Sequence, residues 1–225
     1  MQDSVSDCRA DTDALLRSAR VFVPISLGNH YYNSRILERI LTDVLVKASS
    51  GVIFLCDRLR YLSYLIRGEP NNDRIGRNIQ IQLEQTVRAL TNLGLGSLAN
   101  VTIANWSMLE DDPRYGALLV SVEALLRDVP AVRHEAEVEA AQLLRRFGDP
   151  GKLARKQRLK LQLQYITEET ALSLYMTEIR GFNVELYRRG KGFVDLLYNE
   201  HSDALKSITG KGVLVRKFVS LEEWM

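Results

Sequence analysis

The feature that most constrains the fold is an apolar, β-branched run that ends in a tight turn and continues into an amphipathic segment. Residues 21–25 read Val-Phe-Val-Pro-Ile, and Ser26-Leu27-Gly28-Asn29 follows them. Apolar residues then recur at helical spacing over about 33–47. A strand, a tight loop and a helix in this order are typical of the start of a parallel α/β sheet. Ligands of such sheets bind beyond the carboxyl ends of the strands, so we expect the chemistry of this protein at Ser26 to Asn29.

The rest of the chain alternates in the same way. Short apolar runs typical of buried strands occur at 52–56, 101–104, 184–187 and 213–219. Helical patterns lie between them, at about 79–93, from Asp112-Pro113, from Pro130 to about Phe147, from Asp149-Pro150 to about Met176 and at 193–200. We read 58–67 as a short basic and aromatic segment that leads to a loop. The sequence predicts one α/β domain with a mostly parallel sheet over 20–225, after a tail and lead-in at 1–19.

Length and composition restrict the class of protein. A chain of 225 residues with 46% hydrophobic content can form one substantial core. No apolar run approaches the roughly 20 residues that span a bilayer, and the acidic amino terminus does not resemble a signal peptide. Cys8 and Cys56 form neither a metal-ligand spacing nor a disulfide framework. There is no P-loop and no Gly-x-Gly-x-x-Gly motif. We therefore expect a soluble cytoplasmic protein without a nucleotide cofactor or a metal.

Ser26 is the candidate nucleophile. A hydroxyl presented at a strand end can accept an acyl group, and Asn29 or backbone amides of the helix start can stabilise the oxyanion. The alternative is that Gly28 and Asn29 are simply good turn residues. The Gly-x-Ser-x-Gly elbow of α/β-hydrolases is absent, because Pro24 stands at its first glycine. The sequence has only three histidines, which leaves few candidates for a Ser-His-Asp triad.

Tyr165 and Glu169 are four residues apart on a predicted helix, which places a phenol and a carboxylate on one face. Such a pair can bind an amino group and take a proton from it. The alternative is a surface or half-buried pair without a chemical role. We expect the neighbouring Glu168 to be solvated, and we interpret Trp106 and Trp224 as structural.

A dense basic stretch precedes Tyr165. Its seven cations are opposed only by Asp149, and they are Arg145, Arg146, Lys152, Arg155, Lys156, Arg158 and Lys160. Binding to a phosphate backbone requires clustered charge rather than net charge, which is only +2 here. The alternative is an ordinary solvated helix face. Arg188, Arg189 and Lys191 could extend the same basic side.

This ordered set of motifs resembles the cyclodipeptide synthases. The resemblance rests on Ser26-Leu27-Gly28-Asn29 followed by an aromatic residue (Tyr31 or Tyr32), on Tyr165-x-x-x-Glu169, and on a strand-borne Tyr187. The order, the spacing and the chain size agree over nearly the whole length. That family joins two amino acids, delivered as aminoacyl-tRNAs, into a diketopiperazine. Its fold is similar to the Rossmann-like catalytic domain of class I aminoacyl-tRNA synthetases, without the ATP signatures.

The resemblance implies two aminoacyl-tRNAs as partners, no cofactor and a ping-pong route. Ser26 would receive the first aminoacyl group as an ester, Tyr165 and Glu169 would hold its free amine, and Asn29 and Tyr187 would orient the intermediates. The second aminoacyl-tRNA would give a dipeptidyl enzyme, and cyclisation would release the product. We favour a monomer.

The chain also departs from the family pattern. Pro24 stands where many members have a glycine, and Arg188 follows the site tyrosine in place of its usual partners. Many members carry their basic charge on an earlier helix, whereas it falls near 145–160 here. Tyr175 and Tyr198 are alternatives to Tyr187.

Acidic residues near the predicted site indicate a substrate. Asp57 ends the second predicted strand, Glu178 follows the Tyr165 helix, and Glu185 shares a strand face with Tyr187. A buried carboxylate is costly unless it is paired, and a guanidinium is a bidentate partner. We therefore predict that one substrate is arginine, delivered as arginyl-tRNA, with Glu185 or Asp57 as its partner and with Pro24 and Gly28 beside the substrate. The alternative is pairing of these carboxylates with arginines of the protein itself, namely Arg58, Arg180 or Arg188.

Two other functions stay open at this point. A serine hydrolase or acyltransferase acting on small esters would use Ser26 but has no use for the basic stretch. A non-catalytic RNA-binding module with a synthetase-like fold would use the basic stretch but not Ser26, Tyr165 and Glu169.

Overall fold

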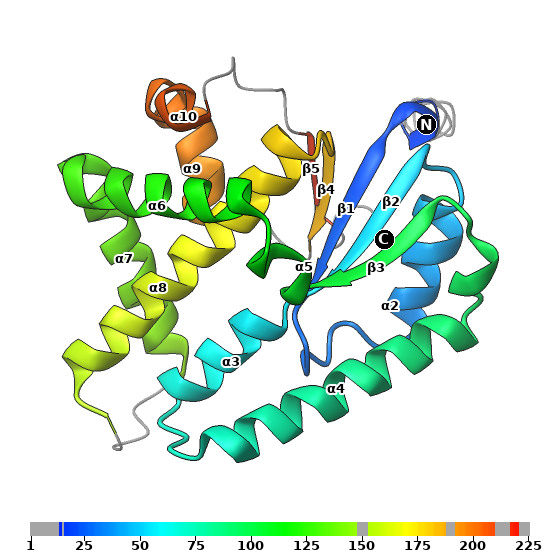
Figure 1. The fold of residues 1–225 in the computed structure, drawn as a ribbon, viewed down its shortest axis with the longest axis horizontal. Helices are drawn as coiled ribbons and strands as arrows, with labels where there is room; N and C mark the ends of the chain where they lie inside the picture. The colour runs from blue at the N-terminus through cyan, green and yellow to red at the C-terminus, as the bar shows by residue number, and fades with distance from the viewer. Residues whose placement is uncertain (1–13, 15, 148–152, 188–191, 210–216, 221–225) are drawn as a thin grey trace, which may run out of the picture.

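The protein folds around one parallel sheet of five strands in the order β3-β2-β1-β4-β5 (Figure 1). The structure is a computed structural model, and it describes residues 14, 16–147, 153–187, 192–209 and 217–220. The strands are β1 (Arg20–Ile25), β2 (Ser50–Leu55), β3 (Val101–Asn105), β4 (Val184–Tyr187) and β5 (Lys217–Ser220). The predicted α/β class and Rossmann-like sheet are thereby confirmed. Residues 213–216 of the last predicted strand lie outside the described residues.

Helices cover both faces of the sheet (Figure 1). One face carries α2 (Ser34–Arg39), the π-helical turn η1 (Ile40–Leu45) that continues it, and α4 (Asn72–Asn92). The remaining elements are α3 (Asp57–Ile66), η2 (Leu95–Ser97), α5 (Ser107–Glu110), α6 (Pro113–Asp128), α7 (Pro130–Phe147), α8 (Arg155–Leu174), η3 (Tyr175–Ile179), α9 (Gly192–Glu200) and α10 (Ser202–Thr209).

Alternating side chains of the strands enter two separate cores. In β2, Val52 and Phe54 pack in the core of the α6–α8 side, whereas Ile53 and Leu55 pack in the core that contains α2 and α4. A sheet buried on both faces requires strands that are apolar at nearly every position. This requirement explains the continuous apolar runs of the sequence. Leu16, from the predicted lead-in, is also buried in the second core.

The start of α6 follows the predicted signal. The Asp112 carboxylate accepts a hydrogen bond from the Arg114 amide, and Pro113 occupies the first turn. Trp106 is 5% exposed and packs edge-on between the rings of Phe54 and Tyr115, which confirms its structural role. Trp224 lies outside the described residues.

Two segments differ from the prediction. Residues 57–66 form helix α3, because Leu59, Leu62 and Ile66 recur at helical spacing and are buried. Helix α4 begins at Asn72 rather than near 79, with the Asn71 side chain accepting a hydrogen bond from the Arg74 amide. Over the described ranges, no helix combines the length and the apolar character that crossing a bilayer requires.

Candidate active site

The strand order creates a crevice beside β1. From β1 the chain proceeds to β2 and β3 on one side, and β4 and β5 lie on the other side. In parallel α/β sheets, ligands bind at such a switch point, beyond the carboxyl ends of the strands. β1 ends at Ile25 and β4 ends at Tyr187, and they are neighbours in the sheet. Ser26, the residue after β1, therefore enters the same crevice as Tyr187.

The hydroxyls of Ser26 and Tyr187 are hydrogen-bonded at 3.3 Å. Burial raises the pKa of Tyr187 well above its ordinary value, and the nearby Glu169 carboxylate raises this pKa further. The phenol is therefore protonated at neutral pH and can both donate and accept a hydrogen bond. This pair joins residues that are 161 positions apart in the sequence.

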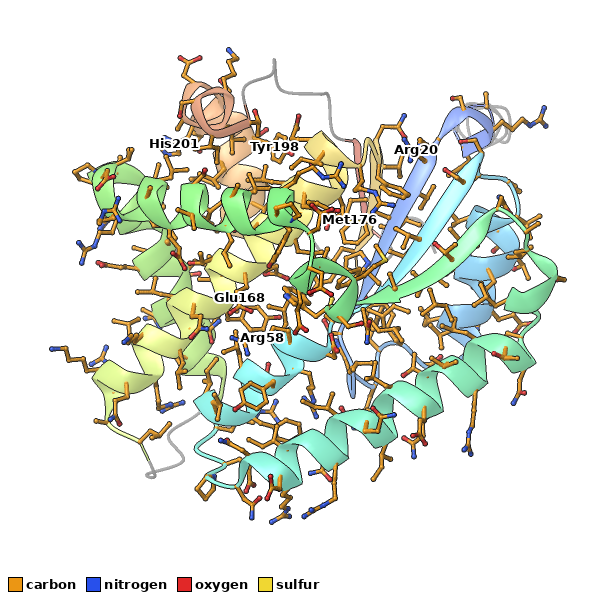
Figure 2. The ribbon with its side chains drawn as sticks, viewed as in Figure 1. Arg20, Arg58, Glu168, Met176, Tyr198 and His201 are labelled. Atoms are coloured by element: carbon orange, nitrogen blue, oxygen red, sulfur yellow. The ribbon has the colours of Figure 1, made fainter. Side chains whose placement is uncertain are left out.

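The two alternative tyrosines lie elsewhere. The Tyr175 hydroxyl donates to Asp112 at 2.6 Å. The Tyr198 hydroxyl donates to Glu178 at 3.1 Å, and Tyr198 lies on α9, away from the carboxyl ends of the strands (Figure 2). Of the three tyrosines that the sequence left open, Tyr187 is the one placed beside Ser26.

The loop after β1 is a tight turn built around a glycine. Gly28 has a φ of +67°, which favours glycine, and the Asn29 amide donates to the Ser26 carbonyl at 3.2 Å. A Cβ atom at Gly28 would lie 2.8 Å from Arg60 Nη2 and 2.9 Å from Gln82 Oε1. The Asn29 side-chain oxygen accepts from the Tyr31 amide at 3.1 Å, which holds the turn. The side-chain NH₂ group of Asn29 can donate a hydrogen bond to an oxyanion.

Tyr165 from α8 lines the same cavity as Ser26, and Glu169 lies one helical turn further along α8. Burial raises the pKa of Tyr165 well above its ordinary value, with the Glu169 carboxylate adding to the effect and Arg60 opposing it. Burial also raises the pKa of Tyr32, and charge from Glu169 contributes there too. The Glu169 carboxylate thus acts electrostatically on three phenols, those of Tyr32, Tyr165 and Tyr187.

Tyr32 also contacts the end of β1 at Pro24. Its hydroxyl donates to the Pro24 carbonyl at 3.1 Å, and its ring packs edge-on against Tyr31 with centroids 5.3 Å apart. The aromatic residue that follows the Ser26 turn therefore ties the loop back to the end of β1.

A cavity of about 880 Å³ opens at this crevice. Ser26, Gly28, Asn29, Tyr165 and Tyr187 line it, together with Cys56 at the end of β2 and Leu143 of α7. Arg60 of α3 and Arg67, which follows the last residue of α3, also line it, and no sequence motif marks them. The helical spacing of Leu59, Leu62 and Ile66 is the signal that could have placed these arginines on the adjacent helix face.

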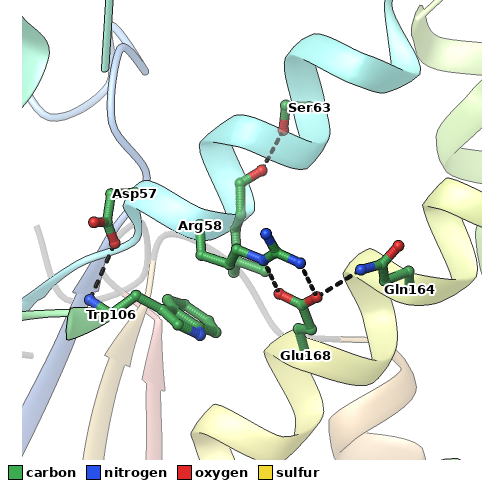
Figure 3. Close-up of polar contacts among 7 residues, drawn as sticks. Asp57, Arg58, Ser63, Trp106, Gln164 and Glu168 are labelled. Carbon is green, nitrogen blue, oxygen red and sulfur yellow. Dashed lines mark hydrogen bonds and ion pairs between the residues drawn. The ribbon is translucent and has the colours of Figure 1, made fainter. Parts of the chain in front are cut away.

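Two predicted substrate-binding carboxylates do not line this cavity. Asp57 accepts a hydrogen bond from the Trp106 amide at 3.1 Å (Figure 3). It also accepts one from the Asn105 side chain at 3.4 Å. Burial raises the pKa of Asp57, and the Trp106 amide opposes that rise. Glu185 is fully buried, and the Ser173 hydroxyl lies 3.2 Å from each of its oxygens.

Glu168 is buried rather than solvated, which corrects the expectation for this residue. Its side chain is 8% exposed and accepts from Arg58 Nε at 3.0 Å, Arg58 Nη2 at 3.2 Å and Gln164 at 2.8 Å (Figure 3). The bidentate pair joins α3 to α8. It therefore holds the helix that carries Arg60 against the helix that carries Tyr165.

The basic stretch is divided between two packed helices. Arg145 on α7 and Arg155, Lys156 and Lys160 on α8 are exposed, whereas Arg158 is only 6% exposed. Arg145, Arg155 and Arg158 line a cavity of about 330 Å³ between these helices. The Arg146 side chain and Lys152, like Arg188, Arg189 and Lys191, lie outside the described residues. Arg158, expected to contact phosphate, faces the protein interior.

Among the residues that the structure describes, no group of three or more His, Cys, Asp or Glu side chains is placed to hold a metal ion. Cys56 is a free, buried thiol.

The fold and the site together define a Rossmann-like α/β protein with a serine hydroxyl at its switch point. The family model of the cyclodipeptide synthases matches residues 6–215. The chain therefore belongs to the cyclodipeptide synthase family and is an aminoacyltransferase. A search of curated protein sequences finds no match.

Solved structures share this fold at low sequence identity. A cyclodipeptide synthase from Fluoribacter dumoffii is 14% identical with a TM-score of 0.75, covering 93% of this chain and 92% of that one. AlbC, a cyclodipeptide synthase from Streptomyces noursei, is 14% identical with a TM-score of 0.70, covering 93% of this chain and 100% of that one. A Mycobacterium tuberculosis protein is 17% identical with a TM-score of 0.66, covering 85% and 82%. Its structure is described as demonstrating that cyclodipeptide synthetases are related to type I tRNA synthetases.

Proposed function

We propose that this protein joins two aminoacyl groups from aminoacyl-tRNAs into a diketopiperazine through an ester on Ser26. The observation that carries the proposal is the hydrogen bond of 3.3 Å between Ser26 and Tyr187 at the switch point of the sheet. Tyr165 lines the same cavity, and the Glu169 carboxylate acts electrostatically on both phenols. Family membership supports this activity.

The first step transfers an acyl group between two hydroxyls. Ser26 Oγ attacks the carbonyl carbon of the aminoacyl ester, and the bond from that carbon to the tRNA 3′ oxygen breaks. The Ser26 proton passes to the departing oxygen, and the neutral Tyr187 phenol can relay it because it both donates and accepts. One oxygen ester replaces another, so the step needs neither ATP nor a redox cofactor.

The second step uses the amine of the bound residue. Glu169 takes a proton from the ammonium group while the Tyr165 phenol stays neutral and donates a hydrogen bond. The free amine attacks the ester carbonyl of the second aminoacyl-tRNA, which releases that tRNA and leaves a dipeptidyl ester on Ser26. The new terminal amine then attacks the Ser26 ester, which closes the ring and restores the hydroxyl.

Labelling tests the ester directly. Incubation with labelled aminoacyl-tRNA should leave label on the wild type and none on Ser26→Ala. Ser63→Ala is the matched control, because Ser63 lines the same cavity but its hydroxyl donates to the Leu59 carbonyl at 2.9 Å. Ser63→Ala should label like the wild type. Equal labelling of Ser26→Ala would rule out the covalent route.

In this proposal, exposed cations and cations that line the cavity bind the phosphate backbone of the tRNA. Arg155, Lys156 and Lys160 are exposed at the start of α8, and Arg60 and Arg67 bring positive charge to the cavity itself. Backbone phosphates are recognised by clustered cations of this kind, without reading of sequence.

The identity of the amino acids is tested by product analysis. We predict that one substrate is arginine, with Glu185 or Asp57 as its partner. This prediction gains no support from the cavity, since neither carboxylate lines it and both are hydrogen-bonded within the protein. Mass spectrometry of the medium of a bacterial host that expresses the protein should detect a cyclic dipeptide containing arginine, altered in Glu185→Gln and Asp57→Asn. Purely apolar products would reject the arginine assignment while leaving the reaction in place.

A further inference from the structure

A second cavity meets the Ser26 loop from the side of α4. It has a volume of about 470 Å³, and Ser26, Gly28, Asn29 and Arg60 line both this cavity and the main one. Its other walls come from the loop that precedes α2 and from one face of α4. Ser26 therefore lies where the two cavities meet.

The two cavities differ in chemistry. The main cavity is lined by Leu59, Leu143, Tyr165 and Tyr187, which suit amino-acid side chains. Besides Ile25 and Tyr32, the part of the second cavity that the main cavity does not share carries side-chain amides and a hydroxyl, from Asn33, Gln82, Gln85 and Thr86. Groups of this kind recognise the polar edge of a base, and glutamine or asparagine can pair with adenine through two hydrogen bonds.

The boundary between the cavities is held in a fixed geometry. Arg60 Nε donates to Gln82 Oε1 at 3.1 Å, and the Gln82 amide donates to the Tyr64 hydroxyl at 3.1 Å. The Arg60 guanidinium also lies over the Tyr64 ring, 4.6 Å from its centroid. Gly28 packs directly on Arg60 and Gln82. A guanidinium fixed at this boundary is well placed to pair with a phosphate.

We propose that the second cavity binds the 3′-terminal adenosine nucleotide of the aminoacyl-tRNA, an inference that rests on the proposed function. The carbonyl carbon of the aminoacyl ester must lie beside Ser26 Oγ. The amino acid and the ribose, which are attached to this carbonyl group, then extend from it in different directions. The main cavity takes the amino acid, and the second cavity takes the nucleotide, with Arg60 on its phosphate. The volume of the second cavity lies within the range of roughly 300–1,000 Å³ that small-ligand sites occupy.

Gln85 allows a test that leaves the reacting groups untouched. It is exposed on α4 at the wall of the second cavity, and alanine is a good helix former at such a position. Gln80→Ala is the matched control, because Gln80 lies on the same helix but donates to Glu84 at 3.0 Å and faces the groove beside β3. Circular dichroism of both variants verifies that they are folded.

The probes are two uncharged acceptor-stem RNA minihelices that end in CCA or CCC and are otherwise identical. We expect the wild type and Gln80→Ala to bind the CCA minihelix at least about fivefold more tightly than the CCC minihelix. A preference of about fivefold is the lower end of the discrimination between bases that a bidentate contact provides. Gln85→Ala should reduce this preference to less than about twofold and leave the affinity for the CCC minihelix nearly unchanged.

Three results would overturn the nucleotide site. They are equal affinity of the wild type for both minihelices, an unchanged preference in Gln85→Ala, and an equal loss for both minihelices, which would mean a backbone contact instead of a base contact. None of them affects the proposed reaction, which labelling of Ser26 tests separately. A wild type that neither binds the minihelices nor becomes labelled would reject both proposals.

Discussion

Ser26 and Tyr187 meet because β1 and β4 are neighbours in the sheet and end at the same edge. Each residue directly follows or ends its strand, so the sheet itself sets their separation. A site fixed by strand ends is more rigid than one carried on loops alone, which suits a hydroxyl that must meet a carbonyl carbon at a defined angle.

The role of the Tyr187 hydroxyl is tested by its removal. Tyr187→Phe keeps the ring but loses the hydrogen bond to Ser26, so the rate of acyl transfer should fall roughly ten- to hundredfold, the value of one hydrogen bond to a group that becomes charged. The free energy of unfolding should change by less than about 1 kcal/mol. Single-turnover labelling and urea unfolding measure the two quantities.

Tyr198→Phe is the control for that experiment. The Tyr198 hydroxyl contacts Thr177 at 2.8 Å and Glu178 at 3.1 Å, away from the cavity. Its loss should lower the free energy of unfolding by about 1–3 kcal/mol, because buried polar groups lose a partner, and should leave the transfer rate unchanged. A transfer rate that falls in Tyr198→Phe and not in Tyr187→Phe would reverse the assignment.

The residues that motifs marked come together in one place in the structure. Ser26, Asn29, Tyr165 and Tyr187 all line the cavity as expected. Arg60 was missed, because its position depends on the packing of α3 and α4 against the Ser26 loop, and no local pattern contains that packing.

At the scale of elements, α3 shows why a helix can be missed. Its N-cap position is Cys56, whose side chain makes no capping hydrogen bond. Asp57, which has the chemistry of a cap, accepts instead from the Trp106 amide at the end of β3. With no start signal and with arginines at several positions, the segment was read as a short basic and aromatic stretch that leads to a loop. Tertiary packing of Leu59, Leu62 and Ile66 decides its structure.

The turn that presents Ser26 depends on Gly28, which can be tested. Gly28→Ala places a Cβ in the left-handed region and 2.8 Å from Arg60 Nη2. The free energy of unfolding should fall by about 1–2 kcal/mol, and acyl transfer should fall with it because the turn and Arg60 must both shift. Denaturant unfolding and Ser26 labelling measure these effects.

Gly76→Ala on α4 is the control for Gly28→Ala, and we expect it to have the opposite effect on the free energy of unfolding. No atom lies within 4 Å of a Cβ built at Gly76. Alanine should therefore stabilise the helix by about 0.5–1 kcal/mol and leave acyl transfer unchanged. If Gly28→Ala behaved like Gly76→Ala, the turn would not require glycine.

For the whole molecule, alternating strands and helices predict an α/β class but not the order of the strands. The neighbours β1 and β4 are separated by most of the chain, so only the assembled sheet shows which strand ends share the crevice. Sequence alone also could not show that Glu185 does not line the cavity. Glu185 shares a face with Tyr187, but it lies two residues further from the strand end, roughly 7 Å deeper in the sheet. At that depth it contacts Ser173 of α8 rather than the cavity.

Charge is also distributed in a way that only the folded molecule reveals. The sequence suggested one run of cations, whereas the structure buries Arg158 and leaves Arg155, Lys156 and Lys160 exposed. Arg158 instead lines the cavity between α7 and α8. Among the cations on α8, Arg155, Lys156 and Lys160 are therefore the ones whose contribution to tRNA binding should be measured.

Replacing Arg155, Lys156 and Lys160 together by alanine should weaken tRNA binding and flatten its dependence on salt. Each lost phosphate contact should reduce the slope of log K against log salt by roughly 0.7–0.9, because fewer counterions are released on binding. The matched control replaces Arg127, Arg133 and Lys206, which are already paired with Asp128, Glu137 and Asp203 at 2.8–3.0 Å. This control removes the same formal charge as the α8 variant. A smaller salt dependence in the α8 variant alone would therefore show that the tRNA binds at α8. Equal slopes in the two variants and the wild type would show that these cations are only solvated.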